Sequence, residues 1–187
     1  MNPSQVISDA KSKFEAAVAH YGEQLKTLRT GRASASMLDG VMVEAYGQPM
    51  PLNQVANVTA PEAQLLQITP FDPGNLQAIA SAIRDNPSLG LNPSDDGRVV
   101  RVPVPALTEE RRREIAKQLS GKQEDAMIAL RTVRREALDS IESSKKDKEI
   151  GEDDAKRLQS QVEDAMKATQ GQVEQATKAK ETEIMTV

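Results

Sequence analysis

Three stretches of the chain repeat apolar residues at spacings of three and four, which is the pattern of amphipathic helices. The first stretch stops at Thr30-Gly31, the second begins after a predicted N-cap at Thr108, and the third follows a turn over residues 147–154. Each stretch has one narrow apolar seam, so together they predict an elongated antiparallel three-helix bundle. The expected seam residues are Ile7, Ala10, Phe14, Ala17, Tyr21, Gln24 and Leu28; Ile115, Leu119, Ala126, Ala129, Val133, Ala137 and Ile141; and Ala155, Leu158, Val162, Ala165, Thr169, Gln172, Ala176 and Ala179.

Residues 31–105 follow a different pattern. They contain nine of the ten prolines, β-like runs at 41–46, 54–59, 65–69 and 99–102, and turn signals at 47–49 and 95–97. One helix is expected over Asp72–Arg84, with Leu76, Ile79, Ala80 and Ile83 on one side. We therefore predict an α+β protein in which a small β/α/β domain, 31–105, is inserted into a discontinuous bundle, 1–30 and 106–187.

Such an insertion requires two connections between the domains. They are expected near Thr30, Gly31 and Arg32 and near Pro103, Val104 and Pro105. Two parallel connections limit the directions of motion, so these residues are predicted to form a hinge.

Composition excludes several classes of function. The chain has no cysteine and a single histidine, His20, which excludes thiol catalysis and Cys-zinc sites and leaves no histidine pair. Glu149, Glu152, Asp153 and Asp154 lack EF-hand spacing and read as acids at a helix start, so no metal site is expected. No phosphate loop is present either, so we expect no catalytic residues, no cofactor and no enzyme. With no long apolar run and no signal-like amino terminus, a cytoplasmic protein without membrane contact is expected.

Charge is segregated along the chain. The whole chain carries −4, whereas residues 111–135 carry +5 and residues 136–187 carry −5. A basic segment in an acidic protein indicates a polyanionic partner for one surface.

On a helical wheel of about 100° per residue, five basic residues of this segment lie within one outward arc. We call them the basic face: Arg113, Lys117, Arg131, Arg134 and Arg135. Arg131 and Arg134 have no acid three or four residues away, whereas Arg135 has Asp139 at i+4. Unpaired arginines at i and i+3 suit phosphate binding. A solvated face, or pairing with acids of the third helix, remains the alternative.

Arg29 and Arg32 flank Gly31 at the expected end of the first helix. A glycine C-cap with favourable cations at the helix C-terminus accounts for both arginines. A phosphate contact beside the hinge is the other interpretation.

Six motifs, taken together, give the chain a close resemblance to the bacterial ribosome recycling factor family. They are residues 28–34 (LRTGRAS), 46–52 (YGQPMPL), 90–93 (GLNP), 101–112 (RVPVPALTEERR), 133–135 (VRR) and 147–150 with 152–154 (DKEI, EDD). The resemblance implies an L-shaped molecule with a three-helix bundle as one arm and a β/α/β domain as the other. It also implies that Arg131, Arg134 and Arg135 contact ribosomal RNA, and it places Arg29, Gly31 and Arg32 at the domain junction.

The resemblance implies a function in translation. Family members bind the large ribosomal subunit after termination and, with elongation factor G and GTP, split the ribosome into subunits. The partners expected from it are the large subunit with its RNA and elongation factor G, and the chain is expected to be a monomer. The rival class is a coiled-coil adaptor, which would expose apolar seams and self-associate.

Overall fold

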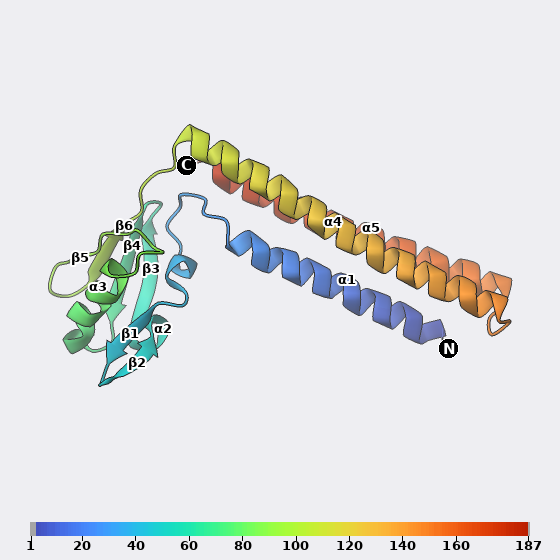
Figure 1. Ribbon diagram of the computed structural model, residues 1–187, viewed down its shortest axis with the longest axis horizontal. Coiled ribbons are helices and arrows are strands. Elements are labelled where there is room, and N and C mark those ends of the chain that lie inside the picture. Colours follow the sequence, from blue (N-terminus) through green and yellow to red (C-terminus); the bar gives the residue numbers. More distant parts are fainter. Residues whose placement is uncertain (1–2, 187) are drawn as a thin grey trace. The chain divides into compact units, whose positions relative to one another are not determined.

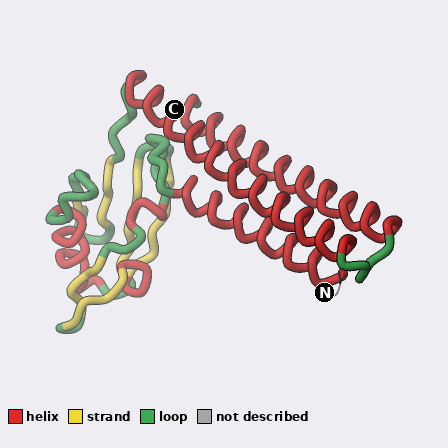
Figure 2. Tube along the Cα trace, turned by 45° about the vertical axis from the view of Figure 1, so that its right-hand side comes forward, coloured by secondary structure: helices red, strands yellow, loops and turns green. Residues whose placement is uncertain are grey.

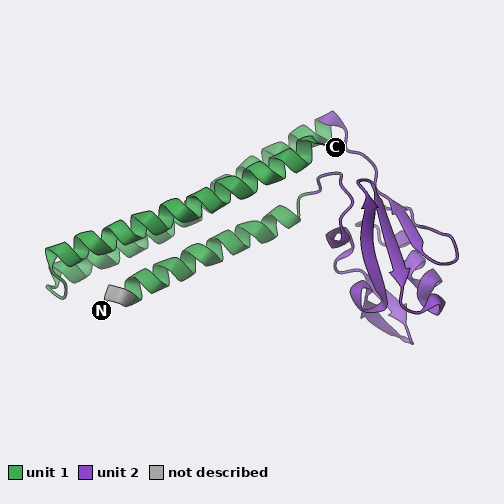
Figure 3. Ribbon diagram, turned by 180° about the vertical axis from the view of Figure 1, so that it is seen from behind, with its two compact units in different colours: residues 1–28, 110–186 green, residues 29–109, 187 purple. Residues whose placement is uncertain are grey.

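The chain folds into two compact units, and the computed structural model describes residues 3–186 of it. Unit 1 contains the residues up to Leu28 and Glu110–Thr186, and unit 2 contains Arg29–Glu109 (Figure 3). This division falls two residues before the predicted boundary at the first crossing and four residues after it at the second. Residues 1, 2 and 187 of the predicted bundle lie outside the described residues.

Unit 1 consists of three long helices that lie side by side (Figures 1 and 2). They are α1 (Pro3–Lys26), α4 (Glu109–Lys146) and α5 (Glu152–Met185). Helix α4 starts directly after Thr108 and runs antiparallel to α1 and α5. Helix α5 starts after Gly151, and Glu152, Asp153 and Asp154 occupy its first turn, where carboxylates complement the helix dipole. The predicted three-helix bundle is therefore confirmed.

The buried seams of the bundle differ from the predicted ones by one residue at several places. On α5, Met166, Val173 and Thr177 are buried in place of the predicted Ala165, Gln172 and Ala176, and Gln172 is exposed. On α4, Leu130 is fully buried and the predicted Ala129 is exposed. On α1, Val6 and Leu25 are buried, whereas the predicted Ile7 and Gln24 are only partly buried.

The period of the helix explains these shifts. The predicted seams assumed heptads, which average 3.5 residues per turn. The buried positions of α5 instead follow spacings of three, four and four, an eleven-residue repeat that averages about 3.67 residues per turn and stays close to a straight α-helix. A heptad seam therefore drifts off the buried side within a few turns. The buried residues of α5 are Ala155, Leu158, Val162, Met166, Thr169, Val173, Thr177 and Ile184.

A buried hydrogen bond joins α1 to α5. Tyr21 Oη lies 2.6 Å from Thr177 Oγ1, and Thr177 Oγ1 itself donates to the Val173 carbonyl at 2.7 Å. Because a hydroxyl has one proton, Tyr21 is the donor and Thr177 the acceptor. The two helices approach each other closely along this side, so the bond lies inside the bundle.

Replacement of either residue of this bond should destabilise the protein, but by different amounts. Thr177→Val leaves a buried phenol without an acceptor, which we expect to destabilise the protein by about 1–3 kcal/mol. Tyr21→Phe leaves Thr177 bonded to Val173, and we expect a smaller loss of about 0.5–1.5 kcal/mol. Urea unfolding followed by circular dichroism measures both. A larger loss for Tyr21→Phe would contradict the assigned direction of the bond.

Tyr21 also predicts a dependence on alkaline pH. Burial raises the pKa of the Tyr21 phenol above its ordinary value of 10.0. The protonated form is therefore favoured by folding. Its contribution is fully present below the unfolded-state pKa and is lost as the pH rises through the raised folded-state pKa. As the pH rises above about 10, the free energy of unfolding should therefore fall less in Tyr21→Phe than in the wild-type protein.

Unit 2 is a small α+β unit built on antiparallel strands (Figure 1). One sheet is the hairpin β1-β2, and the other has the strand order β3-β4-β6-β5. The elements are η1 (Ala35–Leu38), β1 (Met42–Ala45), β2 (Gln48–Pro51), α2 (Leu52–Val55), β3 (Ala56–Glu62), β4 (Leu65–Pro70), η2 (Pro73–Asn75), α3 (Leu76–Arg84), β5 (Ser94–Asp95) and β6 (Val100–Pro103).

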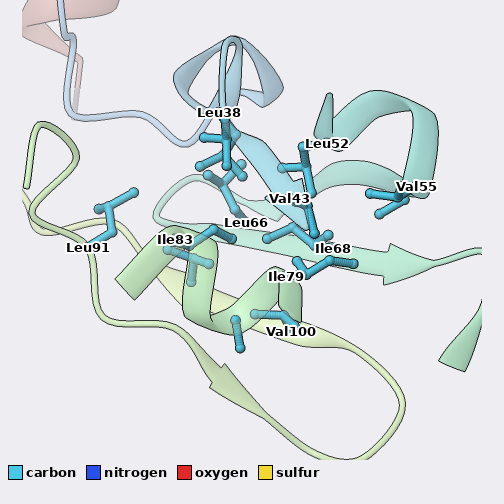
Figure 4. Close-up of a cluster of buried hydrophobic side chains, with 14 of the residues drawn as sticks. Leu38, Val43, Leu52, Val55, Leu66, Ile68, Ile79, Ile83, Leu91 and Val100 are labelled. Carbon is cyan, nitrogen blue, oxygen red and sulfur yellow. The ribbon is translucent and has the colours of Figure 1, made fainter. Parts of the chain in front are cut away.

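Helix α3 and the strands enclose the core of unit 2 (Figure 4). The side of α3 predicted to be apolar is the side that is buried, with Ile79 and Ile83 fully buried. Ile68 of β4 pairs with Val100 of β6, and both face this core. Figure 4 shows these side chains converging with Val43 of β1.

The sequence did not predict β2, β5 or the short helix α2. The residues 47–49 were expected to form a turn, but the turn is Tyr46-Gly47, with φ of 54° and 78° at the two positions. Two successive left-handed residues make the tight turn that connects hairpin strands, so β2 begins at once with Gln48. Pro49 and Pro51 are tolerated there because β2 pairs only with β1, on one edge.

Candidate nucleic-acid interface

The basic face lies along α4, and its five residues differ in exposure. Arg113, Lys117, Arg131 and Arg135 are exposed, whereas Arg134 is half-buried. The apolar side of α4 is turned into the bundle, as shown by the burial of Leu130. Arg113, Lys117, Arg131 and Arg135 lie away from this side and remain open to a partner, whereas Arg134, four residues after Leu130, lies at its edge.

Arg134 is held by a carboxylate of the neighbouring helix. Its Nε donates to both oxygens of Glu163 on α5, at 2.9 Å to Oε1 and 3.0 Å to Oε2, and its Nη2 also donates to Oε1. These hydrogen bonds raise the pKa of the Arg134 guanidinium and lower the pKa of the Glu163 carboxyl. The prediction that Arg134 is unpaired is therefore wrong: its partner lies on the third helix, as the alternative interpretation allowed.

Arg131 is also paired, with an acid of its own helix. Its Nη2 donates to Oε1 of Glu124, seven residues earlier. Seven residues are about two turns, so both side chains lie on one side of α4 and are long enough to meet. The prediction considered only acids three or four residues away, and it missed Glu124 for that reason.

Arg135 shows the opposite difference. The predicted pair with Asp139 is not formed, and within residues 3–186 Arg135 has no ion pair with a carboxylate. Lys117 has none either within the same residues. Two of the three arginines implied to bind RNA are thus neutralised by a carboxylate, and the exposed Arg135 is not.

A groove between α4 and α5 continues from the Arg134–Glu163 pair. Three of its lining residues are acids and one is basic. It is therefore unsuited to a phosphate, and an anionic partner is expected to stay on the arginine side of the pair. The lining residues are Leu138, Asp139, Glu142, Lys156, Gln159, Ser160 and Glu163.

At the first crossing between the units, Arg29 and Arg32 are both exposed. Helix α1 ends at Lys26, so Gly31 lies five residues beyond it and is not its C-cap; that prediction is wrong. Arg29 instead donates through Nη2 to the Ser88 carbonyl at 2.9 Å, and the guanidinium holds a loop of unit 2. Thr30, which lies between the two arginines in the sequence, is buried.

The second crossing begins in the sheet of unit 2. Pro103 is the last residue of β6, and the buried Val104 donates its amide to the Gln64 carbonyl at 2.8 Å. Near the first crossing, the Ala33 amide donates to the Ala63 carbonyl at 2.7 Å. The turn between β3 and β4 thus binds both connecting segments. Of the predicted hinge residues, Pro103 is thus part of strand β6, where it is exposed, and Val104 is buried in unit 2.

Gly31 has a conformation that other residues rarely adopt. Its φ is +76°, and a Cβ at this position would lie 2.9 Å from Leu107 Cγ, in the other connecting segment. Proline cannot reach this φ, so it would distort the backbone rather than simply stiffen it. An alanine would suffer both the left-handed conformation and the contact with Leu107.

Gly31→Ala is therefore expected to destabilise unit 2 by about 1–3 kcal/mol. Gly40→Ala is the matched control, because Gly40 has φ of +83° and a Cβ added there would have no other atom within 4 Å. Thermal unfolding should show a larger loss for Gly31→Ala. The additional loss should disappear when Leu107 is also replaced by alanine. Equal losses for the two glycine variants would contradict the steric role of Leu107.

His20 and the acidic residues are the other polar groups considered from the sequence. His20 is exposed and hydrogen-bonded to Gln24 at 2.9 Å. Over residues 3–186 there is no group of three or more His, Asp or Glu side chains suited to a metal ion. None of the helices in this part of the chain has the length and apolar character needed to cross a membrane.

Comparison with known proteins identifies the family. The family model of ribosome recycling factor matches residues 21–185. The ribosome-recycling factors of Mycobacteroides abscessus and Streptococcus agalactiae are 44% and 41% identical to the chain over 183 residues, which cover 98% of the chain and 98% of each relative. That of Corynebacterium glutamicum is 40% identical over the same length.

Solved structures agree with this result. A solution structure of ribosome recycling factor aligns with a TM-score of 0.80 at 35% identity, over 100% of the chain and 99% of the other. A second structure aligns with a TM-score of 0.69 at 34% identity, over 99% of the chain and 100% of the other. It contains models for the T. thermophilus ribosome recycling factor and the E. coli elongation factor G bound to the E. coli post-termination complex. The predicted α+β fold and the resemblance in sequence are both confirmed, and the chain belongs to the ribosome recycling factor family.

Proposed function

We propose that the bundle anchors the chain to the RNA of the large ribosomal subunit through the basic face. Ribosome recycling is the function of the family, whose members are translation factors without catalytic activity. The chain acts with elongation factor G on the post-termination ribosome, which it disassembles into subunits for a new round of translation. The observation that carries the proposal is the concentration of basic residues on one side of α4 in an otherwise acidic chain.

The expected contacts are with phosphates and with the shape of folded RNA rather than with base edges. Double-helical RNA presents its phosphates and 2′-hydroxyls at the surface, and its narrow major groove excludes side chains. A straight helix with arginines on one side can follow such a surface, and planar guanidinium groups match phosphate oxygens. We assign the contact to Arg131, Arg134 and Arg135, with Arg113 and Lys117 along the same face.

The second part of the proposal is mechanical. Elongation factor G, with GTP, supplies the force, and unit 2 changes its orientation while the bundle stays anchored. Since Pro103 belongs to β6 and Val104 is buried in unit 2, the hinge residues of the second crossing are expected within 105–108, a range that includes the predicted Pro105. At the first crossing, the predicted residues Thr30, Gly31 and Arg32 remain the candidates. The exposed Arg29 and Arg32 then lie beside the moving segment and are proposed to contact RNA there.

Light scattering of post-termination ribosomes tests the function directly. Adding the chain with elongation factor G and GTP should lower the scattering as subunits separate, and omission of any one of the three should prevent this. An equal decrease in scattering without elongation factor G would contradict the proposed mechanism. Scattering that stays constant with all three present would contradict the function itself.

We further propose that the chain acts as a monomer in the cytoplasm, where these ribosomes are found. The coiled-coil adaptor would need an exposed apolar seam. In unit 1, within the described residues, the large apolar side chains that are exposed are Ile128 and Met185, and the seams are buried in the bundle. Sedimentation at several concentrations should give one species of the monomer mass, whereas self-association would favour the adaptor.

A further inference from the structure

The contact between Arg134 and Glu163 uses only one edge of the guanidinium. Glu163 binds Nε and Nη2, while Nη1 has no hydrogen bond within the described part of the chain and is not buried. A guanidinium has five N–H donors in a rigid plane, so the edge that contains Nη1 is still able to bind a phosphate. Glu163 therefore does not block Arg134; it fixes which edge is presented.

Glu163 also changes the charge that an approaching anion meets. The carboxylate lies on Arg134, so the pair is neutral as a unit. A flexible polyanion gains little from a neutral pair and releases fewer counterions from it than from a free arginine. Its phosphates are also repelled by the Glu163 carboxylate when they approach from that side.

A rigid RNA that places a phosphate opposite the open edge is affected differently. The side chain of Arg134 is already oriented, so less conformational entropy is lost when the phosphate binds. Neutralisation thus weakens the attraction for both kinds of RNA, whereas orientation strengthens the binding of folded RNA. Together they lower the affinity for flexible RNA relative to the affinity for folded RNA. The difference between the two affinities is what sets specificity.

We propose that Glu163 is a specificity-determining residue of the basic face, which orients Arg134 toward rigidly placed phosphates and suppresses its attraction for flexible RNA. This inference rests on the proposed function, the binding of the face to ribosomal RNA. Glu124 also pairs with Arg131 from within α4, but through a single hydrogen bond from Nη2, so the edge contact made by Glu163 is specific to Arg134. Arg135, without such a carboxylate, supplies the general attraction.

Glu163→Gln tests the proposal, because glutamine keeps the shape of the side chain and removes its charge. Two affinities are measured for each variant: for isolated large ribosomal subunits and for a single-stranded oligouridine of about 20 nucleotides. We expect oligouridine to bind about two- to fivefold more tightly to Glu163→Gln, the range of an exposed ion pair. Affinity for the large subunit should stay constant or fall, so the ratio of the two affinities should fall at least about twofold.

Glu174→Gln is the matched control. Glu174 is an exposed acid of the same helix without an ion pair in the described residues, so its replacement changes the net charge equally. Its ratio should equal that of the wild-type protein. In a background of Arg134→Ala, Glu163→Gln should have no further effect on the ratio, because Glu163 acts through Arg134.

Two results would overturn the inference. One is a ratio for Glu163→Gln equal to that for Glu174→Gln, and the other is a fall in the ratio that persists without Arg134. Failure of the proposed function is recognised separately: Arg134→Ala alone would then leave the affinity for the large subunit unchanged. If Arg134→Ala weakens that affinity and the ratio for Glu163→Gln remains at the wild-type value, only the role of Glu163 fails.

Discussion

Arg134→Ala is expected to bind the large ribosomal subunit about tenfold more weakly than the wild-type protein. The loss corresponds to one charge-assisted hydrogen-bonded contact with a phosphate, about 1.5 kcal/mol. Because fewer counterions are released, the slope of log affinity against log salt concentration should become shallower, by up to about 0.7–0.9. Titration of labelled protein with large subunits at several salt concentrations measures both quantities.

Arg157→Ala is the control for this experiment. Arg157 is an exposed arginine of the same unit that is also paired with a nearby acid, Asp154, at 2.6 Å, but it lies on α5 and outside the basic face. Its replacement should change neither the affinity nor the slope. If Arg134→Ala resembled Arg157→Ala in both measurements, Arg134 would not contribute to anchoring, and the ion pair with Glu163 would be its whole role.

Ile79→Ala should separate binding from recycling. Ile79 is fully buried in the core of unit 2, and removal of such a side chain destabilises a protein by about 2–5 kcal/mol. Unit 2 has its own core, so it should unfold at a lower temperature while the helices of unit 1 remain folded. Under conditions in which unit 2 is unfolded, the chain should still bind the large subunit through the basic face, without the contacts proposed for Arg29 and Arg32, but should no longer split the ribosome.

Calorimetry and light scattering test this prediction together. The control is Ile128→Ala, the same substitution at an exposed position of α4, which should change stability by no more than about 0.5 kcal/mol. A single transition that moves as a whole in Ile79→Ala would show that the units unfold together. Complete loss of binding in parallel with recycling would place the main anchor in unit 2 rather than on the basic face.

The sequence predicted α3 more accurately than the bundle, for a physical reason. The apolar side of α3 is made of Leu76, Ile79 and Ile83 with one alanine, and its other residues contribute little to an apolar pattern. The long helices contain many alanines, which are compatible with either buried or exposed positions. Ala165 therefore looked as suitable as Met166, and the choice depended on the assumed period.

The carboxylate partner of Arg134 was predictable in principle. In a helical hairpin, residues equally far from the connection lie side by side. Arg134 is 15 residues before Glu149, in the connection between α4 and α5, and Glu163 is 14 residues after it. The charge pattern of α4 alone does not contain this information. The pair of Arg131 with Glu124 needed side-chain orientations as well, and those are set by the neighbours rather than by spacing.

The turn between β3 and β4 has a consequence for how the chain is built. It binds Ala33 and Val104 through the carbonyls of two successive residues, Ala63 and Gln64, so the entry to unit 2 and the exit from it are held next to each other. The entropic cost of closing a loop comes from bringing its two ends together, and here the folded insertion already holds its ends close. For the bundle, the whole insertion therefore behaves as a short connection between α1 and α4. A few-residue linker in place of residues 33–104 should leave the three helices able to fold.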